Sequence, residues 1–246
     1  MNTVLDDNKK LCLMSGEIIQ MGGTMSMMFE TADLEQASPA TVSRCGMIYI
    51  EPYQLGWQPL VNCYMNTLPE KIPKAEKALL KDLFYWCFEA CFEWLIKAKF
   101  MMVTSNQHLA KSMLTMFNCM LDEWSEEAPA LTPAQNTNYL VGSFLLSLVW
   151  SLGATLTADY RLKFDKFLRD LLAGNDEMFP MPKSIKFSKQ TMFPDAETVY
   201  DYCYVKKGSG GWENWTRLIV KKEFAASISI REMIIQTPTL FNKISF

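Results

Sequence analysis

The sequence is poor in the residues from which most metal and catalytic centres are built. It contains one histidine, His108, and its seven cysteines form no CxxC pair. Zinc sites combine several cysteine and histidine ligands at short spacings, so we expect no metal site. The single histidine also leaves no recognisable set of nucleophile, histidine and carboxylate. His108 itself is predicted to be a partly exposed helix residue.

A phosphate-binding loop is also missing. The pattern GxxxxGK[ST], whose backbone amides surround nucleotide phosphates, does not occur in the chain. Lys111 and Lys183 precede a serine but lack the required glycine, and the glycine cluster 208–211 fits a hairpin turn better. No apolar strand ending in Asp-Glu is present to hold magnesium. We therefore expect that the chain is not a complete nucleotide-hydrolysing enzyme and binds no nucleotide stably by itself.

Charge and hydropathy exclude further classes of function. The net charge is −3 and the sequence pI about 5.4, which gives no electrostatic footprint for nucleic acid. The longest apolar stretch, 143–156, is too short for a bilayer, so it predicts a buried helix and no membrane partner. Unpatterned cysteines indicate a reducing compartment, and Cys87 and Cys91 would share one helix face inside the core.

The N-terminal part of the chain predicts short elements separated by turns. The Ser-Gly pair at 15–16 lies between two apolar runs and predicts a β-hairpin. The apolar runs 25–29 and 47–50 predict short strands, the first of them buried. Between them, the Ser-Pro pair at 38–39 predicts the cap and first turn of a helix that ends at Arg44.

The remaining sequence predicts a helical region followed by an irregular one. From Leu55, apolar residues recur at helical spacing, and the last helix would end at Gly174. After that glycine, a stretch rich in proline and lysine is expected to be irregular, and residues 197–205 alternate like a strand. Together the patterns predict a mixed α/β chain that is mostly helical. The expected long helices cover residues 79–96, 106–124, 136–155 and 160–172.

Three charged residues of the N-terminal part are candidates for a functional site. Glu30 and Asp33 follow the predicted strand 25–29, and open α/β sheets place polar active residues at strand ends. A solvated loop explains the two carboxylates equally well. For Arg44 the ordinary interpretation is a surface or ion-pair residue. The functional interpretation is a guanidinium that grips phosphate oxygens on a neighbouring module.

Several long strings in the chain resemble one protein family. They are NTVLDDNKKLCL near the start, SPATVSRCG around Arg44, and further on VWSLGATLTADYRLKFDKFL and FPDAETVYDYCYVKKGSGGWENW. These strings resemble the second AAA+ module of a dynein heavy chain over essentially the whole chain. SPATVSRCG is more similar to axonemal than to cytoplasmic dyneins.

The resemblance implies a layout in three parts. Residues 1–54 correspond to the C-terminal half of a dynein AAA+ large α/β subdomain. Residues 55–175 correspond to the helical small subdomain, and 176–246 to the N-terminal segment of the following AAA+ module. The chain is then expected to be a fragment of a larger motor ring.

The resemblance also assigns roles to individual residues. Arg44 in TVSRCG matches an arginine finger supplied in trans to the nucleotide of the neighbouring first module, where it would stabilise charge on the transferred phosphoryl group. Glu30 and Asp33 match sensor-like positions of the second module's own nucleotide, and Asn2 would lie close to the same pocket. Many AAA+ proteins carry asparagine at the sensor position. Its absence here implies a site that binds nucleotide but hydrolyses it poorly.

At the level of the intact protein, the resemblance implies a minus-end-directed microtubule motor that drives ciliary or flagellar movement by ATP hydrolysis. Its cofactors would be ATP or ADP with magnesium. Its partners would be the neighbouring AAA+ modules, microtubules and the dynein intermediate and light chains, in the cytoplasm, cytoskeleton and ciliary axoneme. The alternative is a freestanding helical interaction module without catalytic activity, which the amphipathic helices and the missing phosphate loop favour.

Overall fold

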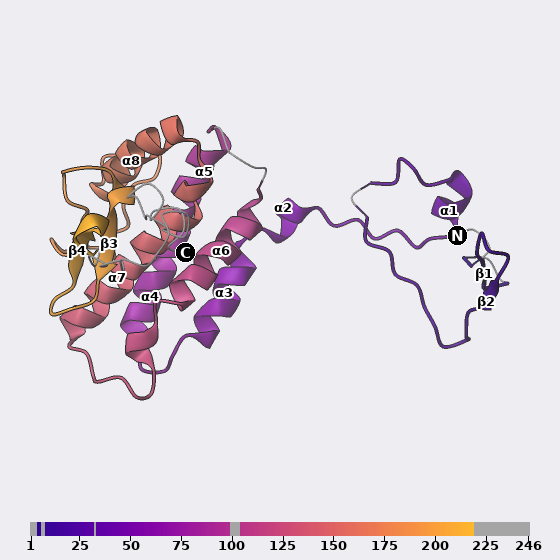
Figure 1. Ribbon diagram of the computed structural model, residues 1–246, viewed down its shortest axis with the longest axis horizontal. Helices are drawn as coiled ribbons and strands as arrows, with labels where there is room; N and C mark the ends of the chain where they lie inside the picture. Colours follow the sequence, from indigo (N-terminus) through magenta and orange to yellow (C-terminus); the bar gives the residue numbers. More distant parts are fainter. Residues whose placement is uncertain (1–3, 6–7, 32, 99–103, 219–246) are drawn as a thin grey trace, which may run out of the picture. The chain divides into compact units, whose positions relative to one another are not determined.

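A computed structural model describes residues 4–5, 8–31, 33–98 and 104–218 of the chain (Figure 1). The chain divides into two compact units, Met1–Gln54 and Leu55–Phe246. The first unit contains two short strands, one short helix and irregular segments, and a second short helix, α2 (Pro52–Leu55), crosses its boundary with the second unit. Long helices dominate the second unit. Each unit is described below by itself.

The N-terminal unit contains the predicted hairpin. Strand β1 (Lys10–Cys12) pairs antiparallel with β2 (Ile18–Gln20), with Leu11 opposite Ile19. Gly16 has φ = 85°, which glycine adopts without steric cost, and its N–H donates to the Leu13 carbonyl at 3.0 Å. The predicted short helix is also present as α1 (Pro39–Ser43). Both predictions are confirmed, because each depends only on nearby residues.

The two other strand predictions in this unit are wrong. Residues 25–29 and 47–50 have no regular secondary structure, and their apolar side chains are exposed, to 95% at Met28 and 86% at Ile48. A strand requires a hydrogen-bonded neighbour, and the alternation of its side chains requires a core on one face. Within the described residues of this unit, neither segment has a strand beside it.

The second unit is a helical bundle whose elements follow the predicted order. Helices α4 and α5 are joined by a π-helical turn, η1, so that residues 74–96 form one continuous helix. The predicted helices 79–96, 106–124, 136–155 and 160–172 are all present, with ends shifted by a few residues. The bounds are α2 (Pro52–Leu55), α3 (Gln58–Thr67), α4 (Lys74–Leu83), η1 (Phe84–Phe88), α5 (Glu89–Ile96), α6 (Asn106–Asn118), α7 (Pro133–Ser151) and α8 (Ala158–Leu172).

Helix α7 forms the centre of this unit. It packs against α4 and α6 and also against strand β3 (Tyr202–Val205) (Figure 1). Its side chains from Asn138 to Val149 are buried. Its start is well defined, because Thr132 caps the helix and exchanges hydrogen bonds with Gln135. Together with the following turn, it is the one helix in the described ranges that is long and apolar enough to cross a membrane, but 83% of its most apolar window is buried inside the unit. The prediction of a buried helix is confirmed.

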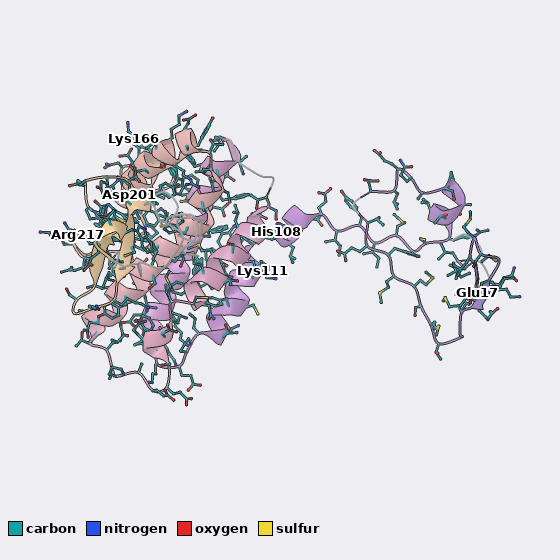
Figure 2. All side chains as sticks on the ribbon, viewed as in Figure 1. Glu17, His108, Lys111, Lys166, Asp201 and Arg217 are labelled. Atoms are coloured by element: carbon teal, nitrogen blue, oxygen red, sulfur yellow. The ribbon has the colours of Figure 1, made fainter. Side chains whose placement is uncertain are left out.

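Two cysteines of the bundle behave as core residues. Cys87 and Cys91 are fully buried, and burial raises the pKa of both thiols well above the ordinary value. Both side chains belong to the same hydrophobic core. The prediction that this i, i+4 pair packs in the core is confirmed. His108 lies on α6 with an exposed side chain, also as predicted (Figure 2).

A β-hairpin covers one side of α7. Strand β3 pairs antiparallel with β4 (Gly211–Asn214), and the turn between them contains Gly208 and Gly210 with φ values of 60° and 77°. The glycine cluster is therefore a hairpin turn, as its composition predicts. Residues 175–196 before the hairpin are irregular, which agrees with the prediction. The strand predicted at 197–205 begins only at Tyr202, because residues 199–201 form a short 3-10 turn capped by Thr198.

Gly142 allows the hairpin to approach α7 closely. A Cβ atom at this position would lie 2.3 Å from the ring of Tyr204, which is far inside any normal contact. Tyr204 cannot swing away, because its hydroxyl end also lies against Gly210 and its ring packs on Trp212 at 5.1 Å between centroids. The fit between helix and hairpin therefore requires glycine at this helical position.

We predict that Gly142→Ala lowers the free energy of unfolding by roughly 1–3 kcal/mol, because the new methyl group overpacks the Tyr204 contact. The measurement is the midpoint of thermal unfolding followed by near-ultraviolet circular dichroism. Gly211→Ala is the matched control, since nothing lies within 4 Å of a Cβ atom there. Equal midpoints for the two variants would contradict the assigned role of Gly142.

Candidate functional site

Arg44 lies at the end of a short helix with well-formed termini. At the start of α1, the Ser38 hydroxyl accepts a hydrogen bond from the Thr41 N–H at 3.2 Å, as predicted for a capping serine. At the other end, the Arg44 N–H donates to the Thr41 carbonyl at 3.3 Å. The Arg44 side chain is exposed, and its charge is favourable at a helix C-terminus. Local hydrogen bonds thus form a short helix, at whose end Arg44 lies exposed on the N-terminal unit.

The other predicted site residues are less organised. Glu30 and Asp33 are exposed in an irregular segment, where the Asp33 carboxylate accepts a hydrogen bond from the Glu35 N–H at 3.2 Å. Residues 25–29, which precede them, do not form the predicted strand, so Glu30 and Asp33 do not lie at a strand end. Asn2 lies outside the described residues. With exposed carboxylates and no phosphate loop, these residues do not fit a complete nucleotide site, and their sensor roles stay predictions.

A larger set of polar contacts lies on the helical unit, where the sequence singled out no site. The irregular residues 176–198, named here the strap, run over the helices and are held by side chains. At one end, the Trp86 indole N–H donates to the Phe179 carbonyl at 2.9 Å. Nearby, the Ser184 hydroxyl donates to the Asp82 carboxylate at 2.7 Å. Both Asp82 and Trp86 belong to the continuous helix 74–96.

The middle of the strap is held by Asn138 of α7, which is only 8% exposed. Its side-chain carbonyl accepts a hydrogen bond from the Ser188 hydroxyl at 2.8 Å, and its amide donates to the Ser209 carbonyl at 3.0 Å. The Thr191 carbonyl in turn accepts from the Trp212 indole at 2.9 Å. One buried asparagine therefore joins the strap to the β3–β4 hairpin. Its side-chain carbonyl and its side-chain amide each have a hydrogen-bond partner, as buried polar groups require.

The last part of the strap is held by an ion pair on α8. The Arg169 guanidinium contacts Asp165 at 3.0 Å, and donates to the carbonyls of Pro194 at 2.7 Å and Glu197 at 3.1 Å. The same Asp165 oxygen accepts the Val199 N–H at 2.8 Å. The i, i+4 spacing of the pair is visible in the sequence. Its contacts with a segment about thirty residues away are not, because they depend on how the chain folds back.

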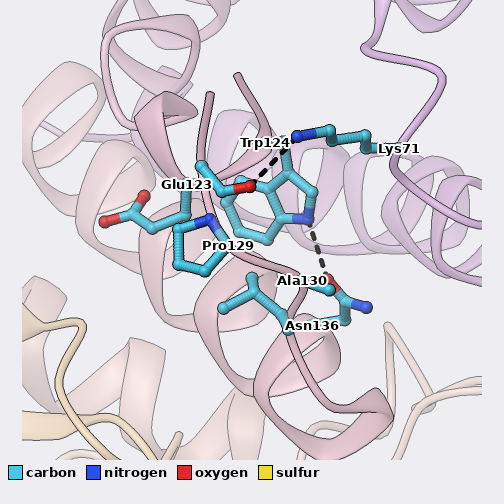
Figure 3. Close-up of a pocket in the computed structure, with 8 residues that line it drawn as sticks. Lys71, Glu123, Trp124, Pro129, Ala130 and Asn136 are labelled. Atoms are coloured by element: carbon cyan, nitrogen blue, oxygen red, sulfur yellow. Dashed lines mark hydrogen bonds between the residues drawn. The ribbon is translucent and has the colours of Figure 1, made fainter. Parts of the chain in front are cut away.

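A shallow pocket on the bundle is explained by loop packing. Its volume is about 260 Å³, and Lys71 lies at its edge (Figure 3). The Lys71 ammonium donates to the backbone carbonyls of Ser125, Glu126 and Ala128. Since an ammonium group has three donors, Lys71 has none left for a ligand. The pocket is lined by Lys71, Glu123, Trp124, Ala128, Pro129, Ala130, Leu131 and Asn136.

We predict that Arg169→Ala loosens the strap and lowers stability by roughly 1–3 kcal/mol, because two carbonyls and one carboxylate lose a charged donor. The Val199 amide should exchange hydrogen faster, as Asp165 loses the partner that orients it. Hydrogen exchange measured by mass spectrometry on peptides covering 190–201 tests this. Lys166→Ala, at an exposed position of the same helix, is the control (Figure 2). Unchanged exchange in these peptides would contradict the clamp.

Known proteins match both the helical unit and the chain as a whole. Residues 80–217 match the family model of the dynein heavy chain AAA lid domain. Over 96% of its length, the chain is 50% identical to dynein axonemal heavy chain 3 of Homo sapiens and 42% identical to dynein axonemal heavy chain 12 of Rattus norvegicus. Over 82% of its length, it is 39% identical to dynein axonemal heavy chain 1 of Rattus norvegicus.

The chain spans 6%, 8% and 4% of the lengths of these three relatives. The family match covers more than half of the chain and includes the bundle from the last turn of α4 onward, the strap and the β3–β4 hairpin. The strap and its anchoring residues therefore lie within a recognised domain. The chain belongs to the dynein heavy chain family, and residues 80–217 are its AAA lid domain.

Proposed function

We propose that this chain is a piece of the motor ring of an axonemal dynein heavy chain, in which the helical unit is a lid that holds the start of the following module in a fixed position. Residues 1–54 belong, in this proposal, to an AAA+ large subdomain and residues 55–175 to the small subdomain. Residues 176–246 are proposed to lead into the following module, and their first part, up to residue 217, lies within the matched lid domain. The intact protein would move along microtubules by ATP hydrolysis in the ciliary axoneme. The identity to axonemal heavy chains supports this assignment.

The observation that carries the lid role is the way in which the strap is attached. Its anchors come from the helix 74–96, from α7 and from α8, and they act on side chains and on the backbone. Ile185 and Phe193 also enter the hydrophobic core, with exposures of 3% and 6%. A segment held at both ends and in the middle must follow any movement of the helices. The lid is therefore suited to transmit a rotation to whatever module follows it.

Arg44 has a separate role in this proposal. Its guanidinium would reach the nucleotide of the neighbouring first module and stabilise charge on the transferred phosphoryl group. The match of SPATVSRCG, the permanent charge and the exposed position support this role. The neighbouring module would bind ATP or ADP with magnesium. Glu30 and Asp33, with Asn2 close by, are proposed as sensor-like residues of the second module's own nucleotide site.

The proposal also names partners for the intact heavy chain. They are its own neighbouring AAA+ modules, microtubules, and the dynein intermediate and light chains. The chain itself contributes contacts between modules and one arginine rather than a complete ATPase site, since it contains no GxxxxGK[ST] loop. Cytoplasm, cytoskeleton and axoneme follow as its proposed locations.

We predict that Arg44→Ala in an intact heavy chain lowers microtubule-stimulated ATP turnover by roughly 10- to 1,000-fold, because arginine fingers contribute orders of magnitude to phosphoryl transfer. Binding of nucleotide to the first module should stay largely unchanged, since the finger acts mainly on the transition state. Steady-state turnover and the binding of a fluorescent nucleotide analogue are the two measurements.

The control is Lys10→Ala, which removes an exposed cation from the same unit. Normal turnover in that variant would show that a loss of positive charge alone has no effect. Unchanged turnover in Arg44→Ala would contradict the finger assignment. An equal loss of nucleotide binding would indicate a structural role instead.

A further inference from the structure

One turn of the continuous helix 74–96 is π-helical. This turn, η1, covers Phe84–Phe88 and lies between α4 and α5. In a π-helix the backbone hydrogen bonds span five residues instead of four, so the turn holds one residue more than an α-helical turn would. The extra residue rotates everything after it by about 100° relative to an uninterrupted α-helix. Because π-helical turns are rare and frequently occur at functional sites, the contacts around η1 indicate what this one does.

On one side, the turn holds the place where the chain enters the helical unit. Trp57 lies close to Leu55, the first residue of this unit, and is only 2% exposed. Its ring packs against Tyr85 at 5.2 Å and against Phe88 at 4.7 Å between centroids. Its indole N–H donates to the Glu89 carboxylate at 2.8 Å. The start of α3 is therefore held by residues within and directly after the π-helical turn.

On another side, the same turn holds the first half of the strap, residues 177–188. The indole N–H of Trp86 donates to the Phe179 carbonyl, and its ring lies 6.2 Å from that of Phe187. One helical turn earlier, Asp82 accepts the hydrogen bond from Ser184. Within the described ranges, no hydrogen bond or ring contact joins the Trp57 side directly to the strap. The two sides meet only through the helix.

The π-helical turn cannot yield on one side alone. Four of its five side chains are buried, and the Phe84 ring packs edge-on against Phe144 of α7 at 4.8 Å between centroids. Closely packed interiors transmit strain and shift between discrete arrangements instead of deforming locally. Without the extra residue, Glu89 would rotate away from Trp57 while Asp82 kept its direction toward the strap. Both sets of contacts therefore require the π-helical geometry at the same time.

We propose that η1 couples the entry of the chain at Trp57 to the first half of the strap, so that a shift at one is passed to the other. The coupling rests on the proposed lid role and deepens it, because it names the turn through which a movement before the lid would reach the strap. It requires neither nucleotide nor a neighbouring module. Its failure would leave the Arg44 assignment untouched, since turnover of the intact heavy chain tests that assignment separately.

Hydrogen exchange of the full chain, followed by mass spectrometry, tests the coupling. Glu89→Ala removes the acceptor of the Trp57 indole. Peptides covering 177–188 should then exchange about threefold to tenfold faster, as coupled contacts do. Peptides covering 190–201 are held by Arg169 of α8 and should stay within about twofold. Glu93→Ala is the matched control, because it removes a carboxylate one turn further along α5, and it should leave both sets within about twofold.

The reverse experiment uses Ser184→Ala, which releases Asp82 from the strap. Because coupling is reciprocal, peptides covering 57–66 should exchange faster by a similar factor. Glu89→Gln keeps the shape of the side chain and should give a smaller change in the same direction as Glu89→Ala, so the test does not depend on one variant. Unchanged exchange at 177–188 in both Glu89 variants would overturn the proposal. So would an equal increase in all peptides, which indicates general destabilisation, or no effect of Ser184→Ala at 57–66.

Discussion

The fold of the helical unit depends on one constraint, which is that α7 is apolar on nearly every side and must be covered on all of them. Helices α4 and α6 cover part of its surface, and strand β3 of the hairpin covers another. Gly142 is the point at which the hairpin comes closest, with the Tyr204 ring lying where a larger residue would place its side chain. Buried polar atoms on such a helix must also be paired, and Asn138 meets that requirement by holding the strap and the hairpin turn together.

That packing explains why an irregular segment can belong to a lid. The strap has no backbone ladder of its own, so its conformation depends on side chains that reach it from three helical elements. Arg169 and Asp165 fasten the end of the strap, since Arg169 binds two of its carbonyls and Asp165 binds the amide of Val199, which follows it directly. In the proposed motor, this arrangement turns a stretch of loop into a rigid extension of the lid.

The N-terminal unit follows a different physical rule. Its hairpin and its capped helix form from contacts between residues close in sequence, while its apolar runs 25–29 and 47–50 are exposed without partners in the described residues. The position of Arg44 depends on contacts between residues that are close in sequence. The Ser38 cap and the hydrogen bond from the Arg44 N–H to the Thr41 carbonyl define the two ends of α1, and both join residues close in sequence.

Sequence alone was enough for the features that local patterns encode: the order and type of the long helices, the two hairpins, the capped helix ending at Arg44, and the burial of Cys87 and Cys91. The family could also be recognised from the sequence, because the chain contains several long strings that resemble it. Only the tertiary structure decided the rest. Strand prediction failed at 25–29 and 47–50, because a strand exists only when another chain segment pairs with it. The strap anchors were missed because an i, i+4 pair such as Asp165 and Arg169 looks the same whether it faces water or a segment thirty residues away. Which side chains meet across such distances is set by how α7 is covered, and that is a property of the folded chain.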